Sequence, residues 1–253
     1  MKSHFGRRRR SPLLRAGLLG AIGALGIGGA LWRYPGAIRA AMLKSGLAPQ
    51  KTVEGAVAEF GPKAEARFAP VCRNLGIPWP PARVRLLAFK RERKLEVWIA
   101  ARRGSFFKAA DYPILAASGD LGPKRREGDK QVPEGFYTLD SLNPNSLFHL
   151  SAHISYPNAD DVAHSSVERP KLGGDIMVHG GSASVGCLAL GDAAIEEVFC
   201  LLAKVPESRR EIWIAPVDFR FDAAWKAPGA EPWVKEMYAA MAARLRGEHG
   251  TKQ

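Results

Sequence analysis

The hydrophobic pattern divides the first third of the chain into two parts. Residues 13–32 form an almost continuous apolar run, LLRAGLLGAIGALGIGGALW. Residues 53–76 place apolar side chains at helical spacing, in VEGAVAEFGPKAEARFAPVCRNLG. Gly61-Pro62 predicts a break into two helices, and Gly76 predicts the end of the second. A helical spacer is therefore expected before the proline-rich connector that follows.

The middle of the chain changes to the pattern of antiparallel strands. VRLLAF, LEVWIAA and YPILAAS are short apolar runs between polar turns. KRERK predicts a solvated hairpin tip, and GDLGPKRREGDKQVPEG predicts a long loop. The charges of that loop are either solvated or available to the carboxylates of a ligand. FYTLDSLNPNSLFHLSAHIS predicts two more strands.

The last third predicts helices around one final strand. DAAIEEVFCLLAK reads as a helix, EIWIAPVDF as a strand, and AEPWVKEMYAAMAARLRGE as an amphipathic helix. The last helix places Trp233, Met237 and Met241 on one face. We expect this face to pack against the body of the protein; a helix lying on a membrane surface is the alternative.

Charge is unevenly distributed along the 253 residues. The formal net charge is +12, but residues 1–44 hold nine cations and no Asp or Glu, which leaves +3 for the rest. A nearly balanced body with a basic leader does not fit a nucleic-acid-binding surface. The 46% hydrophobic content is enough for a core of ordinary size.

The basic leader has the form of an export signal. Arg7 to Arg10 precede the apolar run, as in a secretory signal peptide or an uncleaved signal anchor. No twin-arginine consensus follows, which favours Sec export, with cleavage near Gly29-Ala30 or retention as an anchor. The body is expected in the periplasm, or anchored to the inner membrane and facing the periplasm.

Candidate chemistry is concentrated in GGDIMVHGGSASVGCLAL, residues 173–190. His179 and Cys187 lie eight positions apart, with Gly and Ser between them. IMVH reads as the end of a buried strand, and a helix follows the thiol. A nearby helix N-terminus favours a thiolate, and an imidazole can act as its base. The alternative is a core histidine and a buried cysteine, but a core strand gains little from so many glycines.

HGGSASVGCLAL resembles the active-site signature of the L,D-transpeptidase catalytic domain (YkuD) family. In that signature HG is followed by a loop and then by S-H-G-C-[IVL]-R. Val185 replaces the second His, Ala189 replaces the Arg, and the interval between His and Cys is short. These departures are similar to the YafK branch of murein-acting proteins. VPEGFYTLDSLNPNSLFHLSAHISYPNADD and LLAFKRERKLEVW support that branch, and the resemblance covers roughly residues 81–219.

The resemblance implies an α+β fold, mainly β. It is expected to be a β-sandwich or mixed sheets with helices, flanked by helices at both ends. Four segments are then predicted. They are a basic leader with signal peptide or anchor (1–35), a helical spacer (36–81), an L,D-transpeptidase-like catalytic domain (82–220) and a C-terminal helical extension (221–253).

The resemblance also implies site residues. Cys187 is the expected nucleophile and His179 its base, with the carbonyl of Gly180 orienting the imidazole. Amides at Gly186 and Cys187 are expected to bind the oxyanion, while Ser184 shapes the turn or binds substrate.

His149 and Tyr156 are expected beside the substrate. His149 and His153, four residues apart, also leave open a zinc peptidase that uses His179 as well. The favoured prediction has no metal and no cofactor.

The expected substrates are peptidoglycan stem peptides. The YafK branch implies hydrolysis of an amide at diaminopimelate, which releases a wall-bound lipoprotein. The alternatives are an L,D-transpeptidase that forms cross-links or attaches lipoprotein, and a non-catalytic, membrane-tethered wall-binding protein. Of the three cysteines, Cys187 is expected to be free. Cys72 and Cys200 form a disulfide or, as favoured, stay buried and reduced.

Overall fold

A computed structural model describes residues 42, 45, 50–222, 225, 227 and 229–249. The chain divides into two compact units, Met1–Gln50 and Lys51–Gln253, and the second contains the sheet. The basic leader and its apolar run lie outside the described residues. Within the described ranges, no helix is both long enough and apolar enough to cross a membrane.

The second unit is built on one nine-stranded sheet, with the order β3-β2-β1-β9-β5-β6-β7-β8-β4. The strands are β1 (Arg83–Phe89), β2 (Lys94–Ala100), β3 (Phe107–Pro113), β4 (Ala116–Ala117), β5 (Gly135–Ser146), β6 (His149–Ile154), β7 (Met177–His179), β8 (Leu188–Ala189) and β9 (Arg210–Ala215). The helices are α3 (Val53–Asn74), α4 (Ala159–Ala163), α5 (Asp192–Ala203) and α6 (Pro232–His249), with short 3-10 turns at Arg169–Leu172 and Glu207–Arg209. The predicted α+β class is confirmed.

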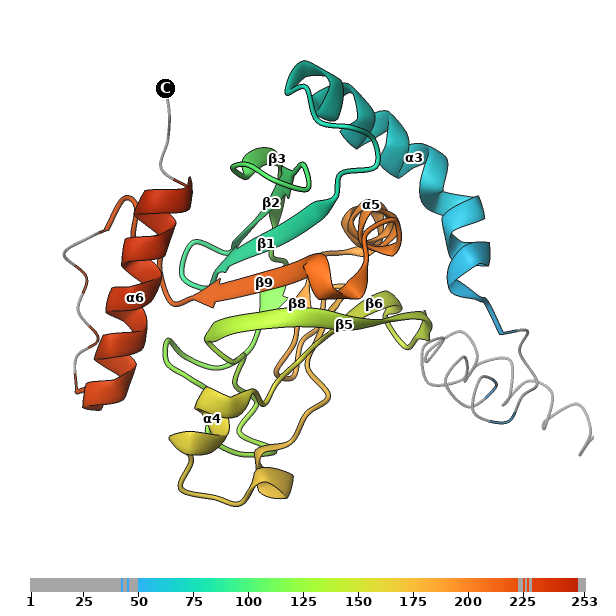
Figure 1. The fold of residues 1–253 in the computed structure, drawn as a ribbon. Helices are drawn as coiled ribbons and strands as arrows, with labels where there is room; N and C mark the ends of the chain where they lie inside the picture. Colours follow the sequence, from blue (N-terminus) through green and yellow to red (C-terminus); the bar gives the residue numbers. More distant parts are fainter. Residues whose placement is uncertain are drawn as a thin grey trace, which may run out of the picture. The chain divides into compact units, whose positions relative to one another are not determined.

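Two apolar cores lie on opposite faces of the β1–β9 part of the sheet. Alternation along the strands sends Leu86 into the core shared with α3 and α5, and Leu87 into the core shared with α6. Figure 1 shows α3 and α5 on one side of these strands and α6 on the other. Tyr238 and Met241 of α6 are buried, so the expected packing of the C-terminal helix against the body is confirmed.

The predicted break at Gly61-Pro62 is wrong, because α3 continues through both residues. Proline removes one helical hydrogen bond, and burial of one helix face offsets that loss. Ala64, Phe68 and Cys72 of that face are fully buried in the core that also contains α5. The boundaries of the four predicted segments stay a prediction.

YPILAAS does not form one strand. β3 lies mostly upstream and ends at Pro113, and only Ala116 and Ala117 return to pair with β8. Pro113 has no N–H to continue the ladder, and Ile114 instead donates to the Arg93 carbonyl at 2.8 Å. The short β4 pairing brings the segment beginning at Ser118 toward the turn that carries Cys187.

Candidate active site

The candidate site lies at the β6-β7-β8 end of the sheet. β7 pairs antiparallel with β6, placing Ser151 opposite His179. It pairs in parallel with β8, placing His179 opposite Ala189. The predicted strand end at IMVH is confirmed, and Cys187 comes immediately before β8.

His179 is held by its own backbone neighbour. Its Nδ1 lies 2.5 Å from the Gly180 carbonyl oxygen. A carbonyl accepts only, so Nδ1 carries the hydrogen and Nε2 keeps the lone pair of a base. Burial lowers the pKa of the His179 imidazole, and the Gly180 hydrogen bond only partly opposes this. The neutral, base-competent form is therefore favoured.

Phe148 covers the imidazole. The two rings stack with centroids 4.5 Å apart and planes at 26°. Phe148 is 42% exposed whereas His179 is 2% exposed. The phenyl ring thus excludes water from one side of the imidazole.

Gly180 cannot carry a side chain at this turn. A Cβ there would lie 2.6 Å from the Asp192 Oδ1 and 2.6 Å from the Phe148 carbonyl oxygen. Asp192, the first residue of α5, accepts a hydrogen bond from the Gly181 N–H at 2.8 Å. This close approach fixes the carbonyl that holds His179.

Cys187 is a partly exposed thiol. Its Sγ accepts from the Met177 N–H at 3.4 Å and donates to the Asp175 carbonyl at 3.7 Å. Burial raises the pKa of the thiol, more than the Met177 amide lowers it. The expectation of a helix-stabilised thiolate is therefore wrong. β8, Leu190 and Gly191 separate Cys187 from the start of α5 at Asp192.

Strand register brings the thiol and the imidazole to one face. Continuing the β7–β8 register by one residue places Cys187 opposite Met177, in agreement with the contact between them. His179 lies two residues further along β7, so its side chain shares that face. Two residues correspond to about 7 Å along a strand. No hydrogen bond joins the two side chains, which both belong to the described part of the chain.

Two serine hydroxyls hold the turn of residues 180–187, which carries Cys187. The Gly186 N–H donates to Ser118 Oγ at 2.5 Å, and the Cys187 N–H donates to Ser184 Oγ at 3.1 Å. Ser184 Oγ donates in turn to the Cys187 carbonyl at 2.6 Å, and Ser118 Oγ to the Lys130 carbonyl at 2.7 Å. Both amides expected to bind an oxyanion thus already have an acceptor. Ser184 Oγ bonds both the N–H and the carbonyl of Cys187, and its two predicted roles, shaping the turn or binding substrate, stay predictions.

The long polar loop folds around a buried ion pair. Lys124 is 7% exposed, lies 2.5 Å from Asp129 Oδ1 and donates to the Arg126 carbonyl. Asp129 also accepts from the N–H groups of Arg125, Arg126 and Gln131. Lys124 is therefore not a solvated charge, unlike the default expectation for this loop. It is a structural cation near the thiol, and sequence pattern alone gave no signal for it.

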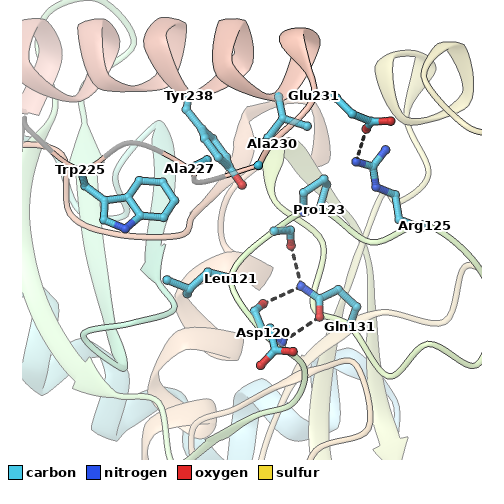
Figure 2. Close-up of a pocket in the computed structure, with 13 residues that line it drawn as sticks. Asp120, Leu121, Pro123, Arg125, Gln131, Trp225, Ala227, Ala230, Glu231 and Tyr238 are labelled. Carbon is cyan, nitrogen blue, oxygen red and sulfur yellow. Dashed lines mark hydrogen bonds and ion pairs between the residues drawn. The ribbon is translucent and has the colours of Figure 1, made fainter.

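A cavity of about 630 Å³ lies between this loop and the C-terminal segment. Figure 2 shows Leu121, Trp225 and Tyr238 around it, with the Arg125–Glu231 ion pair at its edge. The Gln131 side chain lines the cavity. The backbone carbonyl oxygen of Gln131 lies 3.6 Å from where a Cβ would stand if Gly186 carried one. The same loop thus borders both the cavity and the turn that carries Cys187.

The other predicted histidines have partners away from the thiol. His149 Nε2 lies 3.0 Å from Glu196 Oε1, and its ring contacts Phe60. His153 lies 2.6 Å from Asp140 Oδ1 and 2.8 Å from the Gly174 carbonyl. Within the described ranges, no three His, Cys, Asp or Glu side chains are grouped to hold a metal ion.

Tyr156 does not border an open groove. It is 3% exposed, and its ring packs against Tyr137 with centroids 6.2 Å apart. Among the residues that the structure describes, its buried hydroxyl has no hydrogen-bond partner. The aromatic ring of Tyr156 therefore belongs to the core, and its predicted role beside the substrate stays a prediction.

All three cysteines are free thiols. Cys72 and Cys200 are both fully buried. The favoured prediction, buried and reduced, is therefore confirmed in place of a disulfide. Cys187 is the accessible thiol of the three.

The geometry can be compared with known proteins. "Putative L,D-transpeptidase YafK" of Escherichia coli K12 is 39% identical to this chain over 114 residues. Over this segment the chain is similar to that putative L,D-transpeptidase. The YafK match spans 44% of this chain and 44% of the relative, so the chain spans less than half the length of the curated relatives it matches. No family model matches the chain.

Solved structures give weaker likenesses. The helical cell shape determining protein Pgp2 of Campylobacter jejuni (K307A mutant) is 22% identical, with a TM-score of 0.43 over 65% of this chain and 54% of that one. Bd1075 of Bdellovibrio bacteriovorus is 20% identical, with a TM-score of 0.39 over 65% of this chain and 71% of that one. An L,D-transpeptidase of Mycobacterium tuberculosis H37Rv is 14% identical, with a TM-score of 0.28 over 53% and 57%. Likenesses of this size support no functional inference.

Proposed function

We propose that this protein is an exported cysteine acyl-transfer enzyme that acts on peptidoglycan stem peptides and hydrolyses an amide at diaminopimelate, releasing a wall-bound lipoprotein. The observation that carries the proposal is the β7–β8 register, which sets Cys187 and His179 on one face of the sheet. The relation to YafK supplies the reaction class and the polymer.

The chemistry starts from a neutral pair. Burial disfavours the charged forms of both groups, raising the pKa of Cys187 and lowering that of His179. His179 Nε2 takes the thiol proton as Sγ attacks the amide carbonyl carbon and a C–S bond forms. The C–N bond then breaks, and the imidazolium returns the proton to the leaving amine. Water attacks the thioester, the C–S bond breaks, and the thiol is restored.

Gly186 and Cys187 amides are the proposed oxyanion donors. In the resting state both donate to serine hydroxyl oxygens. The substrate oxygen therefore has to replace those hydroxyls, which requires the Ser118 segment to move away from Gly186 and the Ser184 side chain to rotate away from the Cys187 N–H. Gly180 acts only through its carbonyl, as the positioning partner of His179.

The absence of Arg and a second His from the motif favours water over an amine as acceptor. Ala189 and Val185 occupy those positions, and Val185 is 73% exposed. An apolar side chain at the mouth of the turn offers no group to bind an acceptor stem. Cross-linking or attachment of lipoprotein is the alternative outcome of the same acyl-enzyme.

Acylation by a carbapenem tests the nucleophile. Intact mass should show one adduct on the wild type and none on Cys187→Ala, with the buried Cys72 and Cys200 unmodified in both. Absence of the adduct from the wild type, or its persistence on Cys187→Ala, would leave a non-catalytic wall-binding protein.

Lipoprotein-bearing sacculi in ¹⁸O-labelled water test the acceptor. Hydrolysis releases the lipoprotein and places ¹⁸O in the new carboxylate. Transpeptidation instead yields new cross-linked products without label. Sensitivity to a chelator would indicate the zinc peptidase.

A further inference from the structure

A second cavity, of about 790 Å³, lies far from the thiol along the sheet. It opens over β1 and β2, near the C-terminal end of α6, and three strands (β9, β5 and β6) separate β1 from β7. Six of its lining residues are cationic and two are acidic. The proposed reaction uses none of them.

The floor of this cavity is a fixed network of charges. Glu96 is 2% exposed and binds Arg220 and Lys94, each at 2.9 Å. Burial opposes ionisation of Glu96, but the Arg220 and Lys94 hydrogen bonds outweigh it and lower its pKa to about 2. Arg220 also binds Asp218 through two nitrogens. Such a network holds the surrounding side chains in one geometry.

Arg85 extends this floor between two aromatic rings. Its guanidinium lies 4.1 Å from the Phe106 ring centroid and 3.9 Å from that of Trp213. It also forms ion pairs with Glu211 and Glu248, both at 2.7 Å. The charge of Arg85 is thereby compensated within the protein.

Two other lining arginines lack such compensation. Arg83 donates to the carbonyls of Ala101 and Gly104, at 3.0 and 2.5 Å. Arg246 donates to the Phe219 carbonyl at 3.4 Å. Among the described residues, neither guanidinium forms an ion pair. Carbonyl oxygens orient a guanidinium but leave its positive charge unneutralised, so both arginines favour an anion in the cavity.

Exposed aromatic rings stand at the same cavity. Phe107 is 42% exposed and Phe221 is 70% exposed, and both line it. An apolar ring face beside an unneutralised guanidinium matches a ligand that combines a flat C–H surface with a carboxylate. A sugar ring with an acidic substituent has both features.

We propose that this cavity binds a carboxylate-bearing sugar of a wall glycan, with Arg83 and Arg246 on the carboxylate and Phe107 or Phe221 against the ring. The volume suits a ligand of one or two rings, and a concave, charged floor does not suit a lipid surface. The choice of a wall glycan rests on the proposed function. The carboxylate of the acidic sugar is free only where no stem peptide is attached to it, so the site would hold a peptide-free stretch of the strand while the distant thiol acts on a stem peptide carried elsewhere on that strand.

Calorimetric titration of the full chain tests this site. The probes are the disaccharide of N-acetylglucosamine and N-acetylmuramic acid, which carries one carboxylate, and the neutral N-acetylglucosamine dimer. We expect the acidic disaccharide to bind at least about tenfold more tightly, and the difference to shrink as salt screens the charges. Equal affinity for the two probes would overturn the proposal.

Arginine variants locate the binding. Arg83→Gln and Arg246→Gln should each weaken binding of the acidic disaccharide about tenfold, the loss typical of one charge-assisted contact. Arg244→Gln is the matched control, because Arg244 lies on the same helix but contacts the Phe136 ring outside the cavity. It should change affinity less than about twofold. Unchanged binding by the two test variants would refute the site.

Two further measurements separate the possible failures. Carbapenem acylation of Cys187 should keep its wild-type rate in both test variants, so loss of glycan binding is distinguishable from loss of the proposed chemistry. Vesicles of phosphatidylglycerol are the second probe. Arg246-dependent binding to vesicles without binding to the disaccharide would overturn the glycan in favour of a membrane.

Discussion

Ser118 offers the sharpest test of how the turn that carries Cys187 is held. Its hydroxyl accepts from the buried Gly186 N–H at 2.5 Å and donates to the Lys130 carbonyl at 2.7 Å. Gly186 has a φ of +100°, a conformation in which the turn has few other ways to satisfy this amide. Ser118→Ala leaves that N–H buried without an acceptor, which costs about 1–3 kcal/mol. The Lys130 carbonyl is on an exposed residue and regains water, so it adds little.

Urea unfolding and carbapenem acylation measure the effect. With a slope of about 2 kcal/mol per molar urea, a loss of about 2 kcal/mol lowers the unfolding midpoint by about 1 M. The acylation rate should also fall, because the turn that carries Cys187 is no longer fixed. Ser165→Ala is the matched control. Its hydroxyl also makes two local hydrogen bonds, to Val167, in a segment that does not contact the turn.

The unfolding midpoint and the acylation rate together decide whether the hydrogen bond from Gly186 to Ser118 holds the turn. A midpoint and an acylation rate that both match the wild type would show that Ser118 does not hold the turn. A rate that rises while stability falls would show that the hydroxyl blocks the Gly186 amide more than it positions the thiol.

Three other changes follow from burial and charge. Burial lowers the pKa of His179 and raises that of Cys187. Acylation should therefore persist below about pH 6.5. Iodoacetamide should alkylate the Cys187 thiol slowly until about pH 9, and an alkylation rate that already peaks at pH 6 would contradict this. Phe148→Ala exposes the imidazole to water, so the acid limb of the acylation profile should move up toward pH 6.5 and the rate should fall severalfold. The folded-state pKa of Glu96 is about 2, below its ordinary 4.5, so its stabilisation is complete above about pH 4.5 and lost as pH falls toward 2. Glu96→Gln should cost about 3 kcal/mol of unfolding free energy at neutral pH, with a smaller difference near pH 3 in acid denaturation curves.

The strands were predictable because their patterns have short range. Alternation in VRLLAF and LEVWIAA sets which residues face each core, and the polar KRERK tip fixes the hairpin between them. The density of glycine around His179 also identified the turn, since Gly180 lies where no Cβ fits. Local rules failed where packing over long sequence distances decided the outcome. Pro62 stays inside α3 because that helix packs against α5, more than a hundred residues later.

The supporting residues of the site were not predictable for the same reason. Ser118 is an ordinary serine after AA, and only the β4–β8 pairing carries it to Gly186. Lys124 sits in a basic run that reads as solvated, yet Asp129 and the backbone around it bury the charge. Residue type drew attention to His149 and Tyr156. The structure gives their contacts with Glu196 and Tyr137, and their place beside a substrate stays a prediction.

A neutral resting pair suits the compartment that the basic leader predicts. A thiolate is the form of cysteine that oxidises and exchanges with disulfides, and an exported enzyme meets an oxidising environment. Burial keeps the proton on Cys187, and the thiol donates a hydrogen bond to the Asp175 carbonyl at 3.7 Å. His179 stays neutral beneath Phe148 until a substrate carbonyl makes proton transfer productive. The same burial that slows the reactions of the free thiol therefore protects it, and in the proposed reaction the acyl acceptor, water or an amine, decides between hydrolysis and transpeptidation.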